Sequence, residues 1–223
     1  LALDDDLNVF VRDNENDGGD YMIRVYHSIH GADHGYPYHY RERRELALGP
    51  LADMGRGSSA GGVYYGETSF PESYRGGLFF CEWGSSVVFY PRQATGAGFA
   101  PMREQVFASG AATDPYGFKP TDVVVGRDGA LYISDWHNAL IGHMQHNIRD
   151  PHRDHDHGRI YRITYPSRPL VEPALVHGAP IETLLENLKL HEYRSRYRSR
   201  RELRGRDTAE VLDALATWVD GLD

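Results

Sequence analysis

The chain has 223 residues, of which 40% are hydrophobic and 12% aromatic, so a disordered polypeptide is excluded and one or two domains with a hydrophobic core are expected. A formal net charge of -8 opposes general attraction to nucleic acid or to anionic membranes. The sequence shows no signal peptide. It also contains no apolar run of about 18 residues, so no transmembrane segment is predicted in this part of the protein.

Three segments of the chain share one pattern, in which apolar residues run into an acidic residue and then a turn. These segments are residues 7–14, 77–83 and 130–136. The pattern predicts three equivalent strands, with Asp13, Glu82 and Asp135 at the same position. The single cysteine, Cys81, lies in the apolar part of the second segment, which predicts a buried and inert thiol.

Around these segments the sequence predicts meanders of antiparallel strands. One meander is predicted at residues 62–65, 77–83, 86–90 and 105–108, a second at 121–125, 130–135 and 140–144, and a later strand at 159–164. Such meanders are typical of the blades of a β-propeller, and about three blades are too few for a ring that usually needs at least about four. The predicted fold class is therefore mainly β, a partial β-propeller.

After Pro166 the apolar residues recur at helical spacing, which predicts three short amphipathic helices, the third capped by Asp207. The residues expected on their buried faces are Ile181, Leu184, Leu185 and Leu188, then Tyr193, Tyr197 and Leu203, then Val211, Leu212, Leu215 and Trp218. We therefore expect a propeller part at 1–170 and a short α-helical repeat region at 171–223. Residues 194–206 hold seven Arg and one Glu, a composition more typical of the outer face of such a helix than of a nucleic-acid site.

The runs 118–125 and 128–136 resemble the membrane-bound dehydrogenase family of planctomycete-type bacteria, as do 141–146, 157–162 and 197–203. The resemblance implies an exported or periplasmic protein with a propeller similar to quinoprotein glucose and sorbosone dehydrogenases. It also implies HEAT-like helices after the propeller and a c-type haem domain elsewhere in the full-length chain. No Cys-x-x-Cys-His occurs here, so this segment binds no covalent haem.

The same resemblance implies pyrroloquinoline quinone and calcium as cofactors, because residues 17–20 and 31–37 are similar to the loop that holds the calcium of that quinone. The cofactor-binding residues it implies are Lys119, Thr121 and Trp136. The chain departs from those enzymes at Thr121 and in the turn at 83–86, where it has no basic residue. Their catalytic histidine lies in an earlier blade.

Two metal sites are predicted from residue types. Residues 13–18 imitate the start of an EF-hand loop, but the twelfth position is Arg24 where a bidentate Glu is needed, so an EF-hand is excluded. Hard oxygen ligands for calcium could still come from Asn14, Asn16, Asp17 and Asp20; the alternative is a solvated turn. Six of the twelve histidines lie in 137–157, and His143, His155 and His157 could bind zinc or iron; the alternative is a polar, ion-paired loop.

Catalytic residues are predicted where a strand ends, at Asp135 and His137, because a carboxylate can orient an imidazole that acts as a base. The alternative is an aspartate that caps the next turn. Residues 57–61 fit G-x-S-x-G, but a strand follows where a nucleophile elbow needs a helix, so a serine hydrolase is not expected.

Two functions follow from these features. The first is a quinoprotein-type dehydrogenase that oxidises a sugar or an alcohol and passes electrons to a haem domain. The alternative is a non-catalytic propeller and helical-repeat scaffold that binds carbohydrate or protein.

Overall fold

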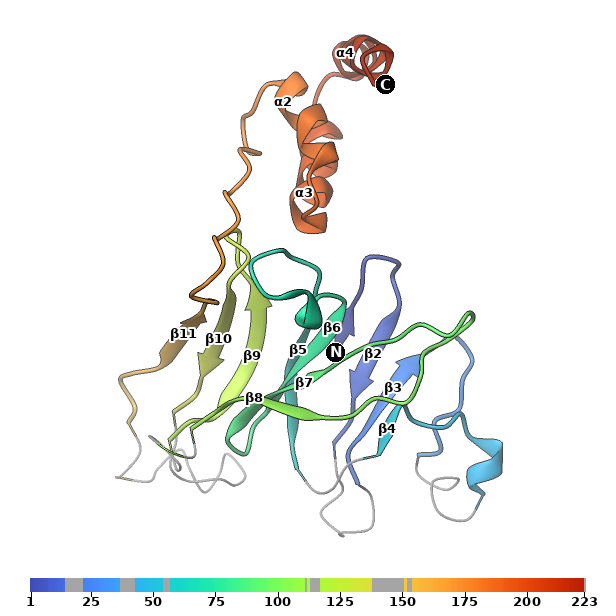
Figure 1. Ribbon diagram of the computed structural model, residues 1–223, viewed down its shortest axis with the longest axis vertical. Coiled ribbons are helices and arrows are strands. Elements are labelled where there is room, and N and C mark those ends of the chain that lie inside the picture. The colour runs from blue at the N-terminus through green and yellow to red at the C-terminus, as the bar shows by residue number, and fades with distance from the viewer. Residues whose placement is uncertain are drawn as a thin grey trace.

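Three antiparallel sheets stand side by side, and a short helical region lies beyond one end of their strands (Figure 1). The structure is a computed structural model and describes residues 1–14, 22–36, 43–53, 57–110, 112, 117–137, 151 and 154–222. The fold is mainly β and propeller-like, as the sequence predicts.

Each sheet is a meander in which consecutive strands pair. The first sheet contains β1 (Ala2–Leu3), β2 (Val9–Arg12), β3 (Arg24–Ser28) and β4 (Ala52–Asp53). The second contains β5 (Ser59–Tyr65), β6 (Gly77–Glu82), β7 (Ser86–Tyr90) and β8 (Gln105–Ser109). The third contains β9 (Pro120–Val125), β10 (Leu131–Asp135) and β11 (Arg159–Ile163). The predicted strand at 140–144 lies outside the described residues, and β11 is the strand that pairs with β10 on the side away from β9.

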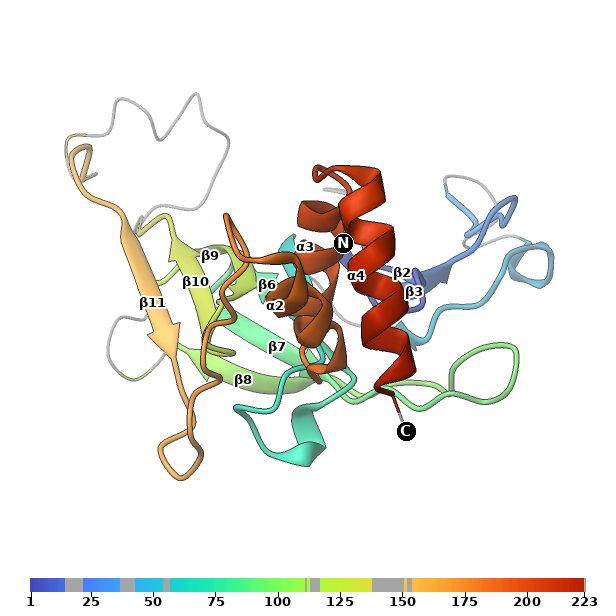
Figure 2. The same ribbon diagram turned by 90° about the horizontal axis from the view of Figure 1, so that it is seen from above.

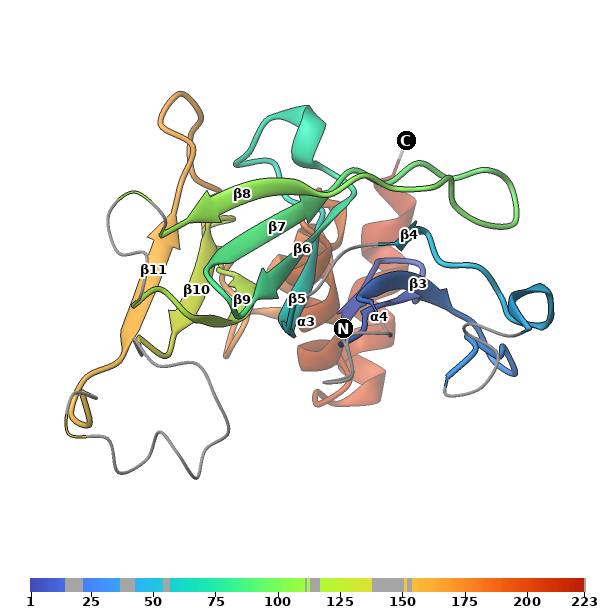
Figure 3. The same ribbon diagram turned by 90° about the horizontal axis from the view of Figure 1, so that it is seen from below.

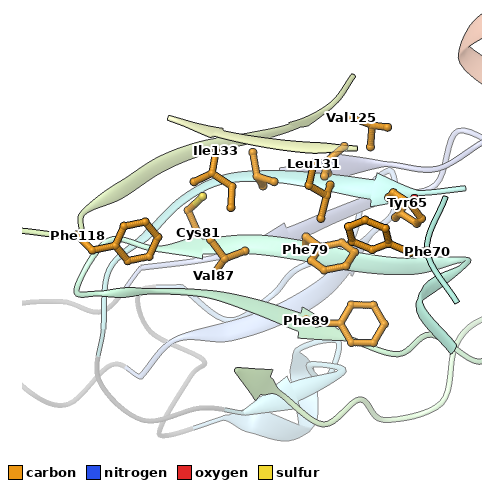
Figure 4. Close-up of a cluster of buried hydrophobic side chains, with 12 residues drawn as sticks. Tyr65, Phe70, Phe79, Cys81, Val87, Phe89, Phe118, Val125, Leu131 and Ile133 are labelled. Atoms are coloured by element: carbon orange, nitrogen blue, oxygen red, sulfur yellow. The ribbon is translucent and has the colours of Figure 1, made fainter. Parts of the chain in front are cut away.

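The middle sheet is buried on both faces, and the alternation of side chains along β6 divides its residues between two cores. Phe79 and Cys81 point toward the third sheet, whereas Leu78 and Phe80 point toward the first. Figure 4 shows the core between the second and third sheets, in which Cys81 lies close to Ile133. The predicted burial of Cys81 is confirmed, and this burial raises the pKa of its thiol to about 12, so the thiol is expected to be unreactive.

The first strands of neighbouring sheets approach closely, and glycine permits this. A Cβ atom added at Gly61 in β5 would lie 1.9 Å from Oδ1 and 2.6 Å from Cα of Asp122 in β9. Figure 3 shows β5 and β9 next to each other when the sheets are seen from below. The glycines of the G-x-S-x-G run therefore serve sheet packing, and Ser59 belongs to a strand.

The helical region is formed by α2 (Ile181–Glu186), α3 (Tyr193–Leu203) and α4 (Thr208–Asp220), and short 3-10 turns occur at Arg44–Leu46, Glu72–Tyr74 and Asn187–Lys189. The predicted cap is confirmed, because Asp207 Oδ1 accepts the backbone N–H groups of Ala209 and Glu210. The predicted buried faces of the last two helices are wrong in part. Tyr197 is 45% and Leu212 57% exposed, since three helices are too few to cover one another. No described helix is long and apolar enough to cross a bilayer.

The helical region contacts the second sheet through the segment that follows β5. Arg194 Nη1 lies 3.2 Å from Glu67 Oε1, and Thr68 Oγ1 donates to Glu192 Oε1 at 3.0 Å. Figure 2 shows the helices above the sheets. Because β5 and β6 are antiparallel, this contact lies at the opposite end of the strands from Glu82, the last residue of β6.

Candidate functional site

Glu82 and Asp135 end the second strands of their sheets and make equivalent contacts, whereas Asp13 directly follows the second strand of the first sheet. Glu82 Oε1 accepts the N–H of Ser58 at 2.7 Å, and Asp135 Oδ1 accepts the N–H of Lys119 at 2.8 Å. Each donor lies directly before the first strand of its sheet. Asp13 Oδ1 accepts the N–H of Arg24, which is the first residue of β3, the third strand of its sheet. The predicted equivalence is confirmed for Glu82 and Asp135 but not for Asp13, which binds the third strand of its sheet. All three carboxylates accept a backbone N–H.

The same repeat brings two tryptophans together at the seam between the second and third sheets. Trp83 N–H donates to Ser58 O at 2.8 Å, and Trp136 N–H donates to Lys119 O at 3.0 Å. The two indoles stack with their ring centroids 5.4 Å apart and an angle of 17° between the planes. Trp83 was not predicted as a site residue, although both tryptophans follow the acidic residue of their strand. The pair forms a flat, half-buried aromatic wall.

Asp135 contacts His137 through the backbone and not through the imidazole. The carboxylate is 3% exposed, and Oδ1 accepts the N–H of His137 at 2.7 Å in addition to that of Lys119. This is the capping arrangement that the sequence left as the alternative for Asp135. A catalytic role of Asp135 stays a prediction.

The ring of His137 contacts a cation from the edge strand of the third sheet. Arg159 Nη2 lies 2.8 Å from His137 Nε2, and since a guanidinium can only donate, Nε2 is the acceptor in this contact. His137 has a φ of 49°, a left-handed conformation that is uncommon for residues other than glycine and that recurs at functional sites. Arg159 was missed in the sequence because β11 is separated from His137 by more than twenty positions.

Lys119 and Thr121, both predicted to bind a cofactor, lie in different surroundings. The Lys119 side chain is 1% exposed, and its Nζ donates to Phe118 O at 3.3 Å. Thr121 lies on the exposed side of β9, where its hydroxyl is 3.0 Å from that of Ser134. The structure therefore brings Lys119 close to Trp136 and Asp135 but places Thr121 on the open face of the sheet. Their roles toward a cofactor stay predictions.

The predicted metal ligands are brought together only in small part. Asn16, Asp17, Asp20 and His143 lie outside the described residues, and Asn14 is exposed. His155 and His157 are also exposed, and His157 Nδ1 contacts Asp154 Oδ2 at 3.0 Å, as the ion-paired alternative expects. In the part of the chain that the structure describes, no group of three or more His, Cys, Asp or Glu could hold a metal ion.

A buried cation joins the first sheet to the second near the tryptophan pair. Arg12, whose side chain is 3% exposed, reaches Glu82 Oε2 at 2.7 Å and Glu104 Oε2 at 3.3 Å. It also donates to Ser59 Oγ at 2.6 Å and to Tyr90 Oη at 3.1 Å. Charge-assisted bonds of this kind fix the end of β2 against the second sheet.

The residue types at this end fit a flat, anionic cofactor such as pyrroloquinoline quinone. Its rings suit the face of the Trp83 and Trp136 pair, and its carboxylates suit a guanidinium such as Arg159. Oδ2 of Asp135, the residue before Trp136, is buried and accepts no hydrogen bond from the residues that the structure describes.

Comparison with known proteins finds one family model and several solved structures. A model described as a domain of unknown function (DUF7133) matches residues 3–167. A structure from Thermus thermophilus, described as an oxidoreductase (glucose dehydrogenase), matches with a TM-score of 0.54 and 18% identity, over 73% of this chain and 43% of that chain. A search of curated proteins finds no match.

Two further matches have TM-scores below 0.5. A glucose dehydrogenase has a TM-score of 0.47 and 15% identity, over 74% of this chain and 39% of that chain. The pyrroloquinoline-quinone-bound aldose sugar dehydrogenase of Streptomyces coelicolor has a TM-score of 0.43 and 19% identity, over 60% and 36%. The chain thus spans less than half of the length of these three structures. The Thermus match shows a shared fold.

Proposed function

This chain belongs to the family described as a domain of unknown function (DUF7133). From its fold and from the residues that follow β6 and β10, we propose that it is part of a dehydrogenase that oxidises a sugar or an alcohol. The cofactor of this proposal is pyrroloquinoline quinone with calcium. The observation that carries the proposal is the stacked pair of Trp83 and Trp136, with the contact of His137 and Arg159 next to it.

Each residue has a distinct task in this proposal. The tryptophan pair would hold the flat face of the quinone and exclude water from it. Arg159 would hold a carboxylate of the cofactor, and Nε2 of His137 would accept the proton of the substrate hydroxyl. Asp135 is a positioning residue that fixes the backbone of Lys119 and His137. The bound quinone supplies the acceptor for the hydride of the substrate carbon.

The remaining parts of this function rest on the family resemblance. Calcium is proposed to bind the acidic segment that includes Asn14, Asn16, Asp17 and Asp20. Electrons are proposed to pass to a haem domain elsewhere in the full-length protein, in the periplasm. HEAT-like helices are proposed to continue the helical region.

The test is dye reduction by the full-length protein loaded with calcium and pyrroloquinoline quinone, in the presence of aldoses and primary alcohols. We expect turnover by the wild type. His137→Ala should lower kcat by about 100-fold or more with a similar cofactor affinity, as expected for the loss of a general base. Trp136→Ala should weaken cofactor binding. The matched control is Trp218→Ala, because Trp218 lies in α4, and it should keep the wild-type rate.

A scaffold without turnover is the second candidate, and one observation favours it. The carboxylate of Asp135 already caps two backbone N–H groups and is buried, as in a structural turn. If the loaded wild type reduces no dye but binds a sugar or a protein, the scaffold replaces the dehydrogenase.

A further inference from the structure

A cleft of about 530 Å³ lies at the end of the sheets that faces the helices. One wall is α3, a second is the linker at residues 174–177, and the third is the turn between β9 and β10 (Figure 1). The cleft is remote from the tryptophan pair, because the turn at Arg127 and the strand end at Asp135 lie at opposite ends of β10. None of its residues belongs to the proposed dehydrogenase site.

Three guanidinium groups line this cleft. Arg127 is fixed to the linker, since its Nη2 donates to Ala174 O at 3.1 Å. Arg198 and Arg201 are three positions apart in α3, which places them on the same side of the helix. Both are exposed, and neither has a carboxylate partner within 4.0 Å among the residues that the structure describes.

The single carboxylate in the lining does not neutralise these cations. Glu202 Oε1 accepts from Arg206 Nη2 at 2.8 Å and from the N–H of Gly178 at 3.2 Å. The backbone N–H of Gly178 and the charge of Arg206 hold the pKa of Glu202 below its usual value. Its charge is thus already compensated by the C-terminal part of the helical region, and the field inside the cleft is positive.

We propose that this cleft binds a small ligand that carries two or more oxyanion groups, either phosphates or carboxylates. The planar guanidinium fork matches both groups through two parallel hydrogen bonds. The volume lies within the usual range for small-molecule sites, about 300–1,000 Å³. Because Arg127 belongs to the third sheet and Arg198 and Arg201 to α3, such a ligand would connect the sheets to the helical region.

The test is calorimetric titration of the full-length protein with pyrophosphate and, separately, with citrate, at constant ionic strength. We expect saturable binding of at least one probe, and the tighter probe identifies phosphate or carboxylate as the group recognised. The double variant R198Q/R201Q should weaken that binding by at least about 10-fold, since it removes two charge-assisted contacts. The matched control is Arg204→Gln, because Arg204 is an exposed arginine at the end of the same helix that does not line the cleft.

Several results would overturn the proposal. One is the absence of saturable binding of both probes to the wild type. Another is an equal loss of affinity in Arg204→Gln, which would indicate general attraction to a basic helix. A circular dichroism spectrum and an unfolding midpoint for each variant show that the substituted proteins are folded. This test measures binding and not dye reduction, so its outcome does not depend on whether the protein is a dehydrogenase.

Discussion

Replacement of Asp135 separates its capping role from a catalytic one. Asp135→Ala removes the oxygen that accepts the N–H groups of Lys119 and His137, at 2.8 and 2.7 Å. A hydrogen bond to a charged group contributes roughly 1.5 kcal/mol or more, so two such bonds give a loss of about 3 kcal/mol in the free energy of unfolding. Asp135→Asn keeps an oxygen at Oδ1, and neutral bonds are about half as strong, which gives a loss of about 1.5 kcal/mol.

The assay is urea unfolding followed by far-ultraviolet circular dichroism, together with dye reduction by the same samples. If Asp135 acts only by fixing the backbone, Asp135→Asn retains most of its turnover rate while Asp135→Ala loses stability and activity together. If Asp135→Asn instead turns over about 100-fold more slowly at nearly unchanged stability, capping is refuted as the main role. That result would assign the carboxylate to the reaction itself.

Three further predictions concern buried groups. Arg12→Met should lower the free energy of unfolding by about 3–5 kcal/mol in urea, because it leaves the carboxylates of Glu82 and Glu104 without their cation. Glu82→Gln should then reduce the stability of the Arg12→Met variant by less than it reduces that of the wild type. Cys81 should react with a thiol reagent only in denaturant, and rapid labelling of the native protein would contradict its burial. Burial raises the pKa of Glu67, so the native state binds this proton more readily than the unfolded chain does. Relative to Glu67→Gln, the wild type should therefore gain stability as the pH falls from neutrality toward 4.5. A loss of stability over that range would contradict the raised pKa.

The strands could be predicted because their side chains alternate and their turns carry glycine. The run from Leu78 to Cys81 is continuous in apolar residues, and the structure explains this by burial on both faces. The equivalence of Glu82 and Asp135 was likewise visible in the sequence, since each ends a strand before a tryptophan.

What the sequence could not provide is the register between sheets. The stacking of Trp83 on Trp136 depends on how the second sheet packs against the third, and no local pattern contains that information. The pairing of Arg12 with Glu82 joins residues that are seventy positions apart. Similarly, β11 pairs with β10 across a long intervening segment, so the contact of Arg159 with His137 was not predicted.

The positions of the three helices in residues 171–222 were predicted, but the segments that cover them were not. Helical periodicity identifies an apolar face without stating whether a neighbour is present. Leu184 and Leu185 are buried because α3 and α4 pack on α2, whereas Leu212 in α4 remains 57% exposed. The division of the chain at residue 170 and the repeat character of the helices stay predictions.

The stacked indoles also provide an optical probe of the seam between two sheets. Trp83 and Trp136 are half-buried against each other, and the third tryptophan, Trp218, lies in α4. In a Trp218→Phe background, the emission spectrum would come from the seam alone. Any separation of the second and third sheets would wet both rings and shift that emission to longer wavelength, so local opening could be followed without an attached dye.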